Sequence, residues 1–299
     1  MAQNGLTNGG LLRGLIVAVR PPEWIKNTFV FAAILFAGKL LDPHALTAVL
    51  ISFVALCLAA SATYLMNDVR DRAADRLHPI KRHRPIAAGI IPPGTAISVA
   101  LGAAAAAIGL AFLVNRPTGL TLIGYLVLTS LYTVFLKHLV ILDVLALAGG
   151  FVLRVILGAE AIQVEFSSWL ILCTFMLAVF LGFAKRRHEL ILLEGQAQAH
   201  RPILGEYSAH FLDMMMGIVT ASTLMSYVLY TMDPHTMEKF GSRNLIYTSV
   251  FVLYGIFRYL YLIHQRSSGG NPAQALYKDA SLQLSVFLWV VTIVLMKYF

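Results

Sequence analysis

Three aspartates and one asparagine recur at helical spacing near the end of the second long apolar run of this 299-residue chain. Asn67, Asp71 and Asp75 are four residues apart. Because a helix turns about 100° per residue, Tyr64 and Asp68 share their face. Carboxylates on one face repel each other unless a cation lies among them, and Mg²⁺ takes oxygen ligands together with substrate phosphates. We therefore predict that Asn67, Asp71 and Asp75 bind Mg²⁺. The predicted catalytic carboxylates are those of Asp68, Asp71 and Asp75.

A basic cluster follows the aspartates and ends at Pro85. Lys81, Arg82 and Arg84 would supply the positive charge that a polyphosphate needs. The alternative is a solvated loop in which Asp and Arg side chains pair at helical spacing. We favour a phosphate site, because the cluster adjoins an apolar span in which charge is costly.

A second charged cluster, residues 185–189, ends the sixth apolar run. Lys185 and Glu189 are four residues apart and share a helix face. We predict that Lys185 and Arg186 bind phosphate and that Glu189 adds a metal ligand. The alternative is a positively charged anchor at the cytoplasmic end of a span.

Arg154 lies within an apolar run, three turns after Asp143 and on the same side. An arginine inside a span predicts a functional site, so Arg154 is a predicted catalytic and phosphate-binding residue. A structural ion pair is the alternative for both residues. Lys26, Tyr64 and Lys137 are further predicted substrate contacts; for the two lysines the alternative is snorkelling at a span end.

The composition predicts an integral membrane protein of the all-α class. Hydrophobic residues make up 58% of the chain and charged residues 13%, against about 25% charged in soluble domains. We expect residues 1–20 to be a cytoplasmic tail and residues 21–299 a nine-helix catalytic bundle with an active-site cavity on the cytoplasmic side. The predicted spans are 25–40, 45–66, 95–114, 118–136, 139–159, 167–184, 210–231, 244–263 and 280–298.

The basic residues predict the orientation of this bundle. Sixteen Lys and Arg residues fall on the side of the N-terminus and of the loops after spans 2, 4, 6 and 8, against five on the other side. The positive-inside rule places the first side, with every motif above, in the cytoplasm. Because the basic residues adjoin spans, nucleic acid is not an expected partner.

The motif Asn67-Asp68-x-x-Asp71-x-x-x-Asp75 resembles the first Asp-rich motif of the UbiA superfamily of intramembrane prenyltransferases. Typical members carry a second Asp-rich motif after span 6, which binds a second Mg²⁺ on a prenyl diphosphate. This chain instead has Lys185-Arg186-x-x-Glu189. That pattern is similar to the decaprenyl-phosphate phosphoribosyltransferase branch, as are two others: Pro22-x-Trp24-x-Lys26-Asn27 and His78-Pro79-x-Lys81-Arg82-x-Arg84-Pro85-Ile86-Ala87-Ala88-Gly89.

The resemblance implies a Mg²⁺-dependent glycosyltransferase of the plasma or inner membrane. Members of that branch transfer 5-phosphoribosyl from 5-phosphoribosyl 1-diphosphate to a polyprenyl phosphate and release diphosphate, for arabinan and cell-wall precursor synthesis. Mg²⁺ would neutralise the leaving group, and Lys81, Lys137, Arg154 and Lys185 would clamp the phosphates.

Two other functions stay open on the sequence. The first is a UbiA-type aromatic prenyltransferase with a polyprenyl diphosphate donor, against which the missing second Asp-rich motif argues. The second is a transporter or lipid-binding membrane protein, which would leave the clustered carboxylates unexplained. The sequence also leaves the polyprenyl length and a homo-oligomeric state open.

Overall fold

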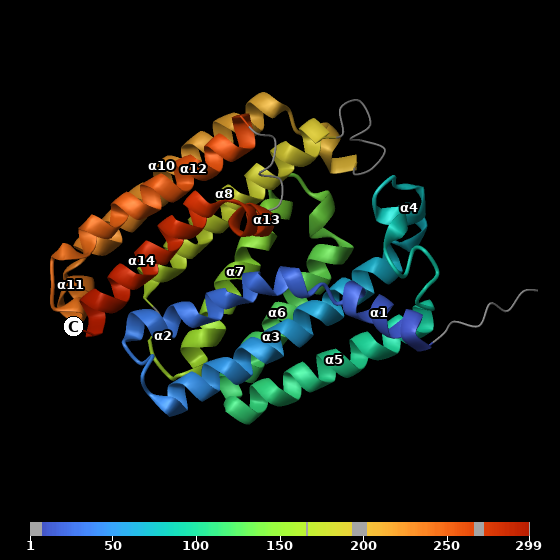
Figure 1. Ribbon diagram of the computed structural model, residues 1–299, viewed down its shortest axis with the longest axis horizontal. Helices are drawn as coiled ribbons and strands as arrows, with labels where there is room; N and C mark the ends of the chain where they lie inside the picture. The colour runs from blue at the N-terminus through green and yellow to red at the C-terminus, as the bar shows by residue number, and fades with distance from the viewer. Residues whose placement is uncertain (1–7, 166, 193–201, 266–271, 299) are drawn as a thin grey trace, which may run out of the picture.

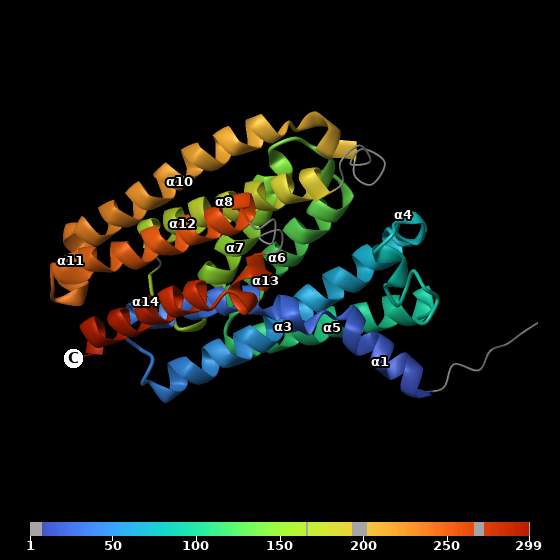
Figure 2. The ribbon, with the colours of Figure 1, turned by 45° about the horizontal axis from the view of Figure 1, so that its top comes forward.

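The computed structural model describes residues 8–165, 167–192, 202–265 and 272–298. Within these ranges every regular element is a helix, which confirms the all-α class. Long helices lie side by side along the longest axis of the molecule (Figures 1 and 2). Residues 1–7 of the predicted tail lie outside the described ranges, and the tail's remaining part includes helix α1 (Asn8–Ala18).

Eight helices are long and apolar enough to cross a membrane within the part of the chain that is described. At about 1.5 Å per residue, such helices match the hydrocarbon thickness of a bilayer. They are α3 (Pro43–Arg70), α5 (Pro93–Val114), α6 (Arg116–Val134), α7 (Leu142–Ala161), α8 (Ser168–Leu192), α10 (Ala209–Met232), η5 with α12 (Asn244–Thr248 and Ser249–Gln265) and α14 (Ala280–Tyr298).

The first predicted span takes a different form. A 3-10 helix, η1 (Pro21–Phe31), leads directly into a short α-helix, α2 (Ala32–Ala37), which ends at Gly38 in the left-handed conformation. These pieces have 11 and 6 residues and are not among the eight candidate spans. The count of nine spans therefore stays a prediction, whereas eight spans follow from length and composition.

Short elements connect the long helices. They are α4 (Arg72–Leu77), η2 (Lys81–His83), η3 (Leu136–His138), η4 (Pro202–Glu206), α11 (Pro234–Phe240) and α13 (Pro272–Lys278). Polar caps begin several of the long helices: Asp42 accepts hydrogen bonds from backbone N–H groups of α3, and Asn115 and Ser208 do the same for α6 and α10.

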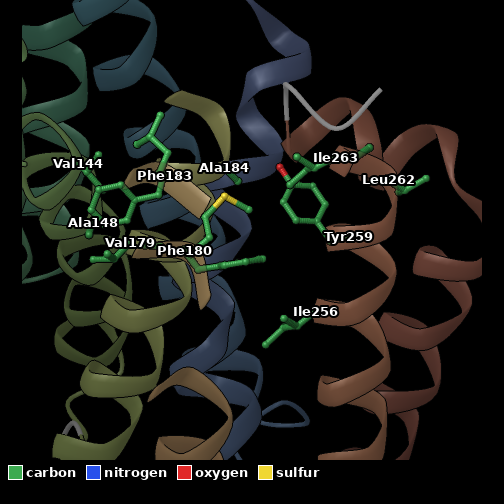
Figure 3. Packing of buried hydrophobic residues seen from close by; sticks show 14 of the residues in the cluster. Val144, Ala148, Val179, Phe180, Phe183, Ala184, Ile256, Tyr259, Leu262 and Ile263 are labelled. Carbon is green, nitrogen blue, oxygen red and sulfur yellow. The ribbon is translucent and has the colours of Figure 1, made fainter. Parts of the chain in front are cut away.

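Four apolar cores lie within the described part of the bundle, and two of them meet at α7. In one, Phe180 and Phe183 of α8 pack beside Val144 of α7 and opposite Tyr259 of α12 (Figure 3). The second joins η1, α2, α3, α5, α6 and α7, with Leu56 among its buried residues. Helix α7 contributes to both cores, so the packing fixes the helix that carries Asp143 and Arg154.

The charged motifs gather at one end of this bundle. Helix α4 and the α6–α7 connection lie at the same end, and α2, α11 and the C-terminal end of α14 lie at the opposite end (Figures 1 and 2). This arrangement agrees with loops that share one side of a membrane. That this side faces the cytoplasm stays a prediction.

Candidate active site

The Asp-rich motif spans a break between two helices. Helix α3 ends at Arg70 and α4 begins at Arg72, with Asp71 between them. The N–H of Asp71 still donates to the carbonyl of Asn67 (2.8 Å), and the N–H of Asp75 donates to the carbonyl of Asp71 (2.8 Å). The i to i+4 backbone hydrogen bonds of a helix therefore continue through the motif.

Asp68 and Asp75 meet at a single guanidinium. Arg84 Nη1 lies 3.0 Å from Asp68 Oδ1 and 2.7 Å from Asp75 Oδ2, and both carboxylates are buried. Arg20 also donates to Asp68 Oδ1, and its guanidinium stacks over the ring of Tyr64, 4.8 Å from the centroid. Arg84, predicted as a phosphate contact, is here the link between two motif carboxylates.

Asp71 pairs with a residue 66 positions away. Lys137 Nζ, on η3 in the α6–α7 connection, lies 3.0 Å and 3.1 Å from the two carboxylate oxygens of Asp71. Both side chains keep partial exposure, 15% for Lys137 and 31% for Asp71. Asp71, a predicted metal ligand, is therefore in direct contact with Lys137, a predicted phosphate contact.

The donor set suits Mg²⁺, although no preformed cage is present. Among the residues that the structure describes, no three His, Cys, Asp or Glu side chains are arranged to hold a metal ion. The three motif carboxylates instead face cationic nitrogens of Arg20, Arg84 and Lys137. Carboxylate oxygens are hard ligands of the kind Mg²⁺ prefers.

Arg154 is buried among neutral partners. Its Nε donates to Asn27 Oδ1 (2.9 Å), its Nη2 to the Tyr125 hydroxyl (2.9 Å) and its Nη1 to the Gly150 carbonyl (2.8 Å). The guanidinium also stacks over the rings of Tyr125 and Phe151. Only 7% of Arg154 is exposed, and none of these contacts carries a negative charge. A buried cation of this kind is suited to an anionic ligand.

Asn27 and Tyr125, the partners of Arg154, are not among the residues predicted for the site. Asn27 belongs to the quoted Pro22-x-Trp24-x-Lys26-Asn27 pattern, which was the one signal that could have identified it. Lys26 itself pairs with Glu23 rather than with the buried group. No local pattern marks Tyr125, because it contacts Arg154 across 29 residues.

Arg186 and Glu189 bind each other within a buried network. Arg186 is fully buried, with Nε 2.5 Å from Asp143 Oδ2, Nη1 2.7 Å from Glu189 Oε2 and Nη2 3.2 Å from the Tyr132 hydroxyl. The guanidinium therefore already forms ion pairs with two carboxylates, those of Asp143 and Glu189. Asp143 pairs with Arg186, which confirms the structural ion-pair alternative for that aspartate.

The remaining predicted basic contacts are more open to solvent. Lys185 is 40% exposed and lies 4.0 Å from Glu189. Lys81 is half-buried, and Arg82 is exposed beside His83. A cavity of about 410 Å³ lies at the opposite end of the bundle, lined by Ala37, Val164, Glu165, His235, Glu238 and Lys239. The predicted cytoplasmic cavity at the motif end stays a prediction.

The fold defines the class of protein. A UbiA homolog from Archaeoglobus fulgidus, in a structure bound to GPP and Mg²⁺, superposes with a TM-score of 0.72 at 16% identity, over 95% of this chain and 98% of that one. A UbiA homolog from Aeropyrum pernix K1 gives 0.67 at 15% identity, over 92% and 98%. This chain therefore has the fold of the UbiA homologs.

The sequence places the chain within a family. The UbiA prenyltransferase family matches residues 27–295, so the chain belongs to that family. A decaprenyl-phosphate phosphoribosyltransferase from Corynebacterium glutamicum is 35% identical, over 96% of this chain and 88% of that protein. Proteins with the same name from Mycolicibacterium smegmatis and Mycobacterium tuberculosis are 33% and 32% identical, over 97% and 95% of this chain and 94% of each of theirs.

Proposed function

We propose that this protein transfers a 5-phosphoribosyl group from 5-phosphoribosyl 1-diphosphate to a polyprenyl phosphate, with release of diphosphate. The observation that carries the proposal is the combination of one Asp-rich motif with a basic second cluster around Lys185, where the resemblance implies further carboxylates in a prenyl diphosphate enzyme. The names of the relatives at 32–35% identity support the same reaction. By analogy with them, decaprenyl phosphate is the first acceptor to test.

The reaction needs charge neutralisation more than proton transfer. The bond between the anomeric carbon and the diphosphate oxygen breaks, and diphosphate leaves with the electron pair. An oxygen of the polyprenyl phosphate forms the new bond to the same carbon. Because that oxygen is already anionic near neutral pH, no general base is required. Positive charge held near the leaving group would stabilise the transition state.

Asn67, Asp71 and Asp75 would hold Mg²⁺, which when bound neutralises the diphosphate as it leaves. Lys137 is adjacent to Asp71, so the charge that would bind phosphate lies beside the carboxylate that would bind the metal. Lys81 and Lys185 would add positive charge from η2 and α8. These residues bind and orient the two anionic substrates.

Arg154 would bind one anionic substrate group at the inner end of the site. Its neutral partners, Asn27, Tyr125 and the Gly150 carbonyl, fix the guanidinium without cancelling its charge. Lys26 adjoins Asn27 in η1, and Lys26 and Tyr64 would be further substrate contacts. A phosphate is the group whose geometry suits a planar guanidinium.

The proposed site works at the cytoplasmic face of a cell membrane. The excess of basic residues at the motif end supports this orientation. The polyprenyl chain would remain in the bilayer beside the apolar helices, and only its phosphate would enter the site. The division into a tail of residues 1–20 and a catalytic bundle of residues 21–299 is part of this proposal.

A donor comparison tests the function. Purified protein in lipid nanodiscs would receive 5-phosphoribosyl 1-diphosphate with and without decaprenyl phosphate, or a polyprenyl diphosphate with an aromatic acceptor. We expect diphosphate release only from the first donor, dependent on both decaprenyl phosphate and Mg²⁺. Release from the polyprenyl diphosphate alone would instead identify an aromatic prenyltransferase. No release from either donor would favour a non-enzymatic role.

A further inference from the structure

One backbone conformation near the site is unfavourable. Ile141, the last residue before α7, has φ 67° and ψ −45°. A β-branched residue rarely adopts a positive φ, because its side chain collides with its own backbone. Such strained conformations persist only where surrounding contacts enforce them, and they cluster at functional sites.

Tyr207 makes the side-chain contact that holds the backbone of Ile141. The N–H of Ile141 donates to the Tyr207 hydroxyl oxygen (2.7 Å), and that hydroxyl donates to Asp143 Oδ1 (2.8 Å). Tyr207 is buried and stacks on Phe211, with ring centroids 6.1 Å apart. Burial, together with the hydrogen bond to Asp143, raises the pKa of Tyr207 to about 12, so its hydroxyl stays protonated at physiological pH.

The same network reaches the other end of the α6–α7 connection. Asp143 Oδ2 accepts from Arg186, and Arg186 donates to the Tyr132 hydroxyl, near the end of α6. Tyr132 and Ile141 bracket the connection, and η3 within it contacts η4, the helix just before Tyr207. The connection is therefore held at both of its ends by one buried set of hydrogen bonds.

Lys137 is the charged residue on this held connection. Its ammonium group pairs with both oxygens of Asp71 in the Asp-rich motif. A short helix that joins two spans would otherwise allow a lysine many positions. The strain at Ile141 and the buried network restrict the connection, and so restrict where Lys137 can lie.

We propose that Tyr207 is a positioning residue, whose hydroxyl holds the α6–α7 connection so that Lys137 lies against Asp71. The expected effect of Tyr207 on turnover rests on the proposed phosphoribosyl transfer. Tyr207 acts through Lys137 and touches no substrate. The network also gives Arg186 a positioning role, as the buried cation that orients Asp143 towards Tyr207.

The test compares two buried tyrosines. Tyr207→Phe keeps the ring that stacks on Phe211 and removes both hydrogen bonds. Tyr227→Phe is the matched control, because its buried hydroxyl bonds Thr248 and Trp289, each at 2.7 Å, in a different core. Hydrogen–deuterium exchange of both variants and the parent would be followed in nanodiscs without substrate.

We expect the amide of Ile141 to exchange about tenfold faster in Tyr207→Phe and at the parental rate in Tyr227→Phe, because only the first loses the local hydrogen bond. Unchanged exchange at Ile141, or the same increase in both variants, would overturn the proposal. This measurement needs no turnover, so it tests whether the Tyr207 hydroxyl holds Ile141 even if phosphoribosyl transfer is never observed.

A double-mutant cycle tests the route through Lys137. With the proposed substrates, Tyr207→Phe should lower kcat/KM by about tenfold, since small misplacements at a site cost up to about a hundredfold. Tyr227→Phe should stay within about twofold of the parent. In a Lys137→Met background, Tyr207→Phe should have almost no further effect, because interacting residues are non-additive. Additive losses would show that Tyr207 does not act through Lys137.

Discussion

Gly158 of α7 lies so close to Val30 of η1 that no side chain can be placed between them. A β-carbon at Gly158 would lie 2.0 Å from the Val30 carbonyl oxygen and 2.9 Å from its carbon. Gly158 is one turn after Arg154, and Val30 is three residues after Asn27. Because residues three apart eclipse in a 3-10 helix, this backbone contact also brings Asn27 to Arg154.

Gly158→Ala should therefore separate η1 from α7. We expect a loss of about 1–3 kcal/mol in the free energy of unfolding, as in overpacked cores, together with a large loss of turnover. Gly124→Ala on α6 is the control, because a β-carbon there meets nothing within 4 Å. It should leave stability unchanged or raise it by about 0.5–1 kcal/mol. Equal thermal unfolding of both variants would contradict the close approach.

The sequence predicted what depends on local periodicity. The spacing of Asn67, Asp71 and Asp75 predicted helical periodicity through the motif, and the i to i+4 backbone hydrogen bonds continue there. The shared metal-binding face stays a prediction. The long apolar runs predicted the eight helices that the structure describes as candidate spans. These features follow from helix geometry and from the cost of polar groups in a bilayer, which act on neighbouring residues.

The sequence could not predict the partners of the charged groups. Asp143 and Arg154 were correctly expected on one side of a helix, yet Asp143 pairs with Arg186 across 43 residues and Arg154 with Asn27 across 127. Such pairs depend on how helices pack, which no local pattern encodes. The 3-10 form of η1 was also missed, since its apolar residues suit a membrane span equally well.

Asp71→Asn tests the metal assignment while it keeps the size of the side chain. An amide cannot supply the negative charge that Mg²⁺ and Lys137 share, so we expect turnover to fall by at least about a hundredfold at any Mg²⁺ concentration. The assay is diphosphate release over a Mg²⁺ titration. Asp42→Asn is the control, because asparagine caps a helix as well as aspartate and Asp42 lies at the far end of α3.

Near-parental turnover of Asp71→Asn at saturating Mg²⁺ would remove this residue from the metal site. Loss of turnover in both aspartate variants, with an altered circular dichroism spectrum, would instead indicate damage to α3. The two outcomes are therefore separable in one set of preparations.

Arg154→Lys and Arg154→Leu separate charge from geometry. Lysine keeps the charge but cannot reach Asn27, Tyr125 and the Gly150 carbonyl together, so the variant should fold and lose most of its activity. Leucine removes a buried charge that has neutral partners, so this variant should be well tolerated structurally and inactive. Arg258→Lys is the control, because Arg258 lies on α12 in an ion pair with Asp279, and this variant should stay active.

The informative measurement is thermal stability beside activity for all three arginine variants. An active Arg154→Leu protein would show that no substrate anion binds there. If both Arg154 variants unfold at lower temperature with or without substrate, Arg154 is a structural residue and the site must be described without it.

Lys185 and Arg186 are neighbours with opposite expected behaviour. Lys185→Ala removes a half-exposed cation with a weak ion pair, so stability should change by less than about 1 kcal/mol. If Lys185 binds the donor, the variant should bind 5-phosphoribosyl 1-diphosphate more weakly. The binding free energy should become less favourable by about 1.5–3 kcal/mol, the value of one hydrogen bond to a charged group. Calorimetric titration gives the affinity, and equal affinity would leave Lys185 as a topology anchor.

Arg186→Ala should act on stability first. Both Arg186 and Asp143 are fully buried, so removal of the guanidinium leaves the Asp143 carboxylate without its cation, at a cost of about 3–5 kcal/mol. Thermal unfolding of the detergent-solubilised variants would measure this loss beside that of Lys185→Ala. Arg186→Lys should recover only part of it, because one ammonium group cannot meet Asp143, Glu189 and Tyr132 with the geometry of a guanidinium. Parental stability of Arg186→Ala, combined with weaker donor binding, would return Arg186 to direct phosphate contact and argue against the buried network.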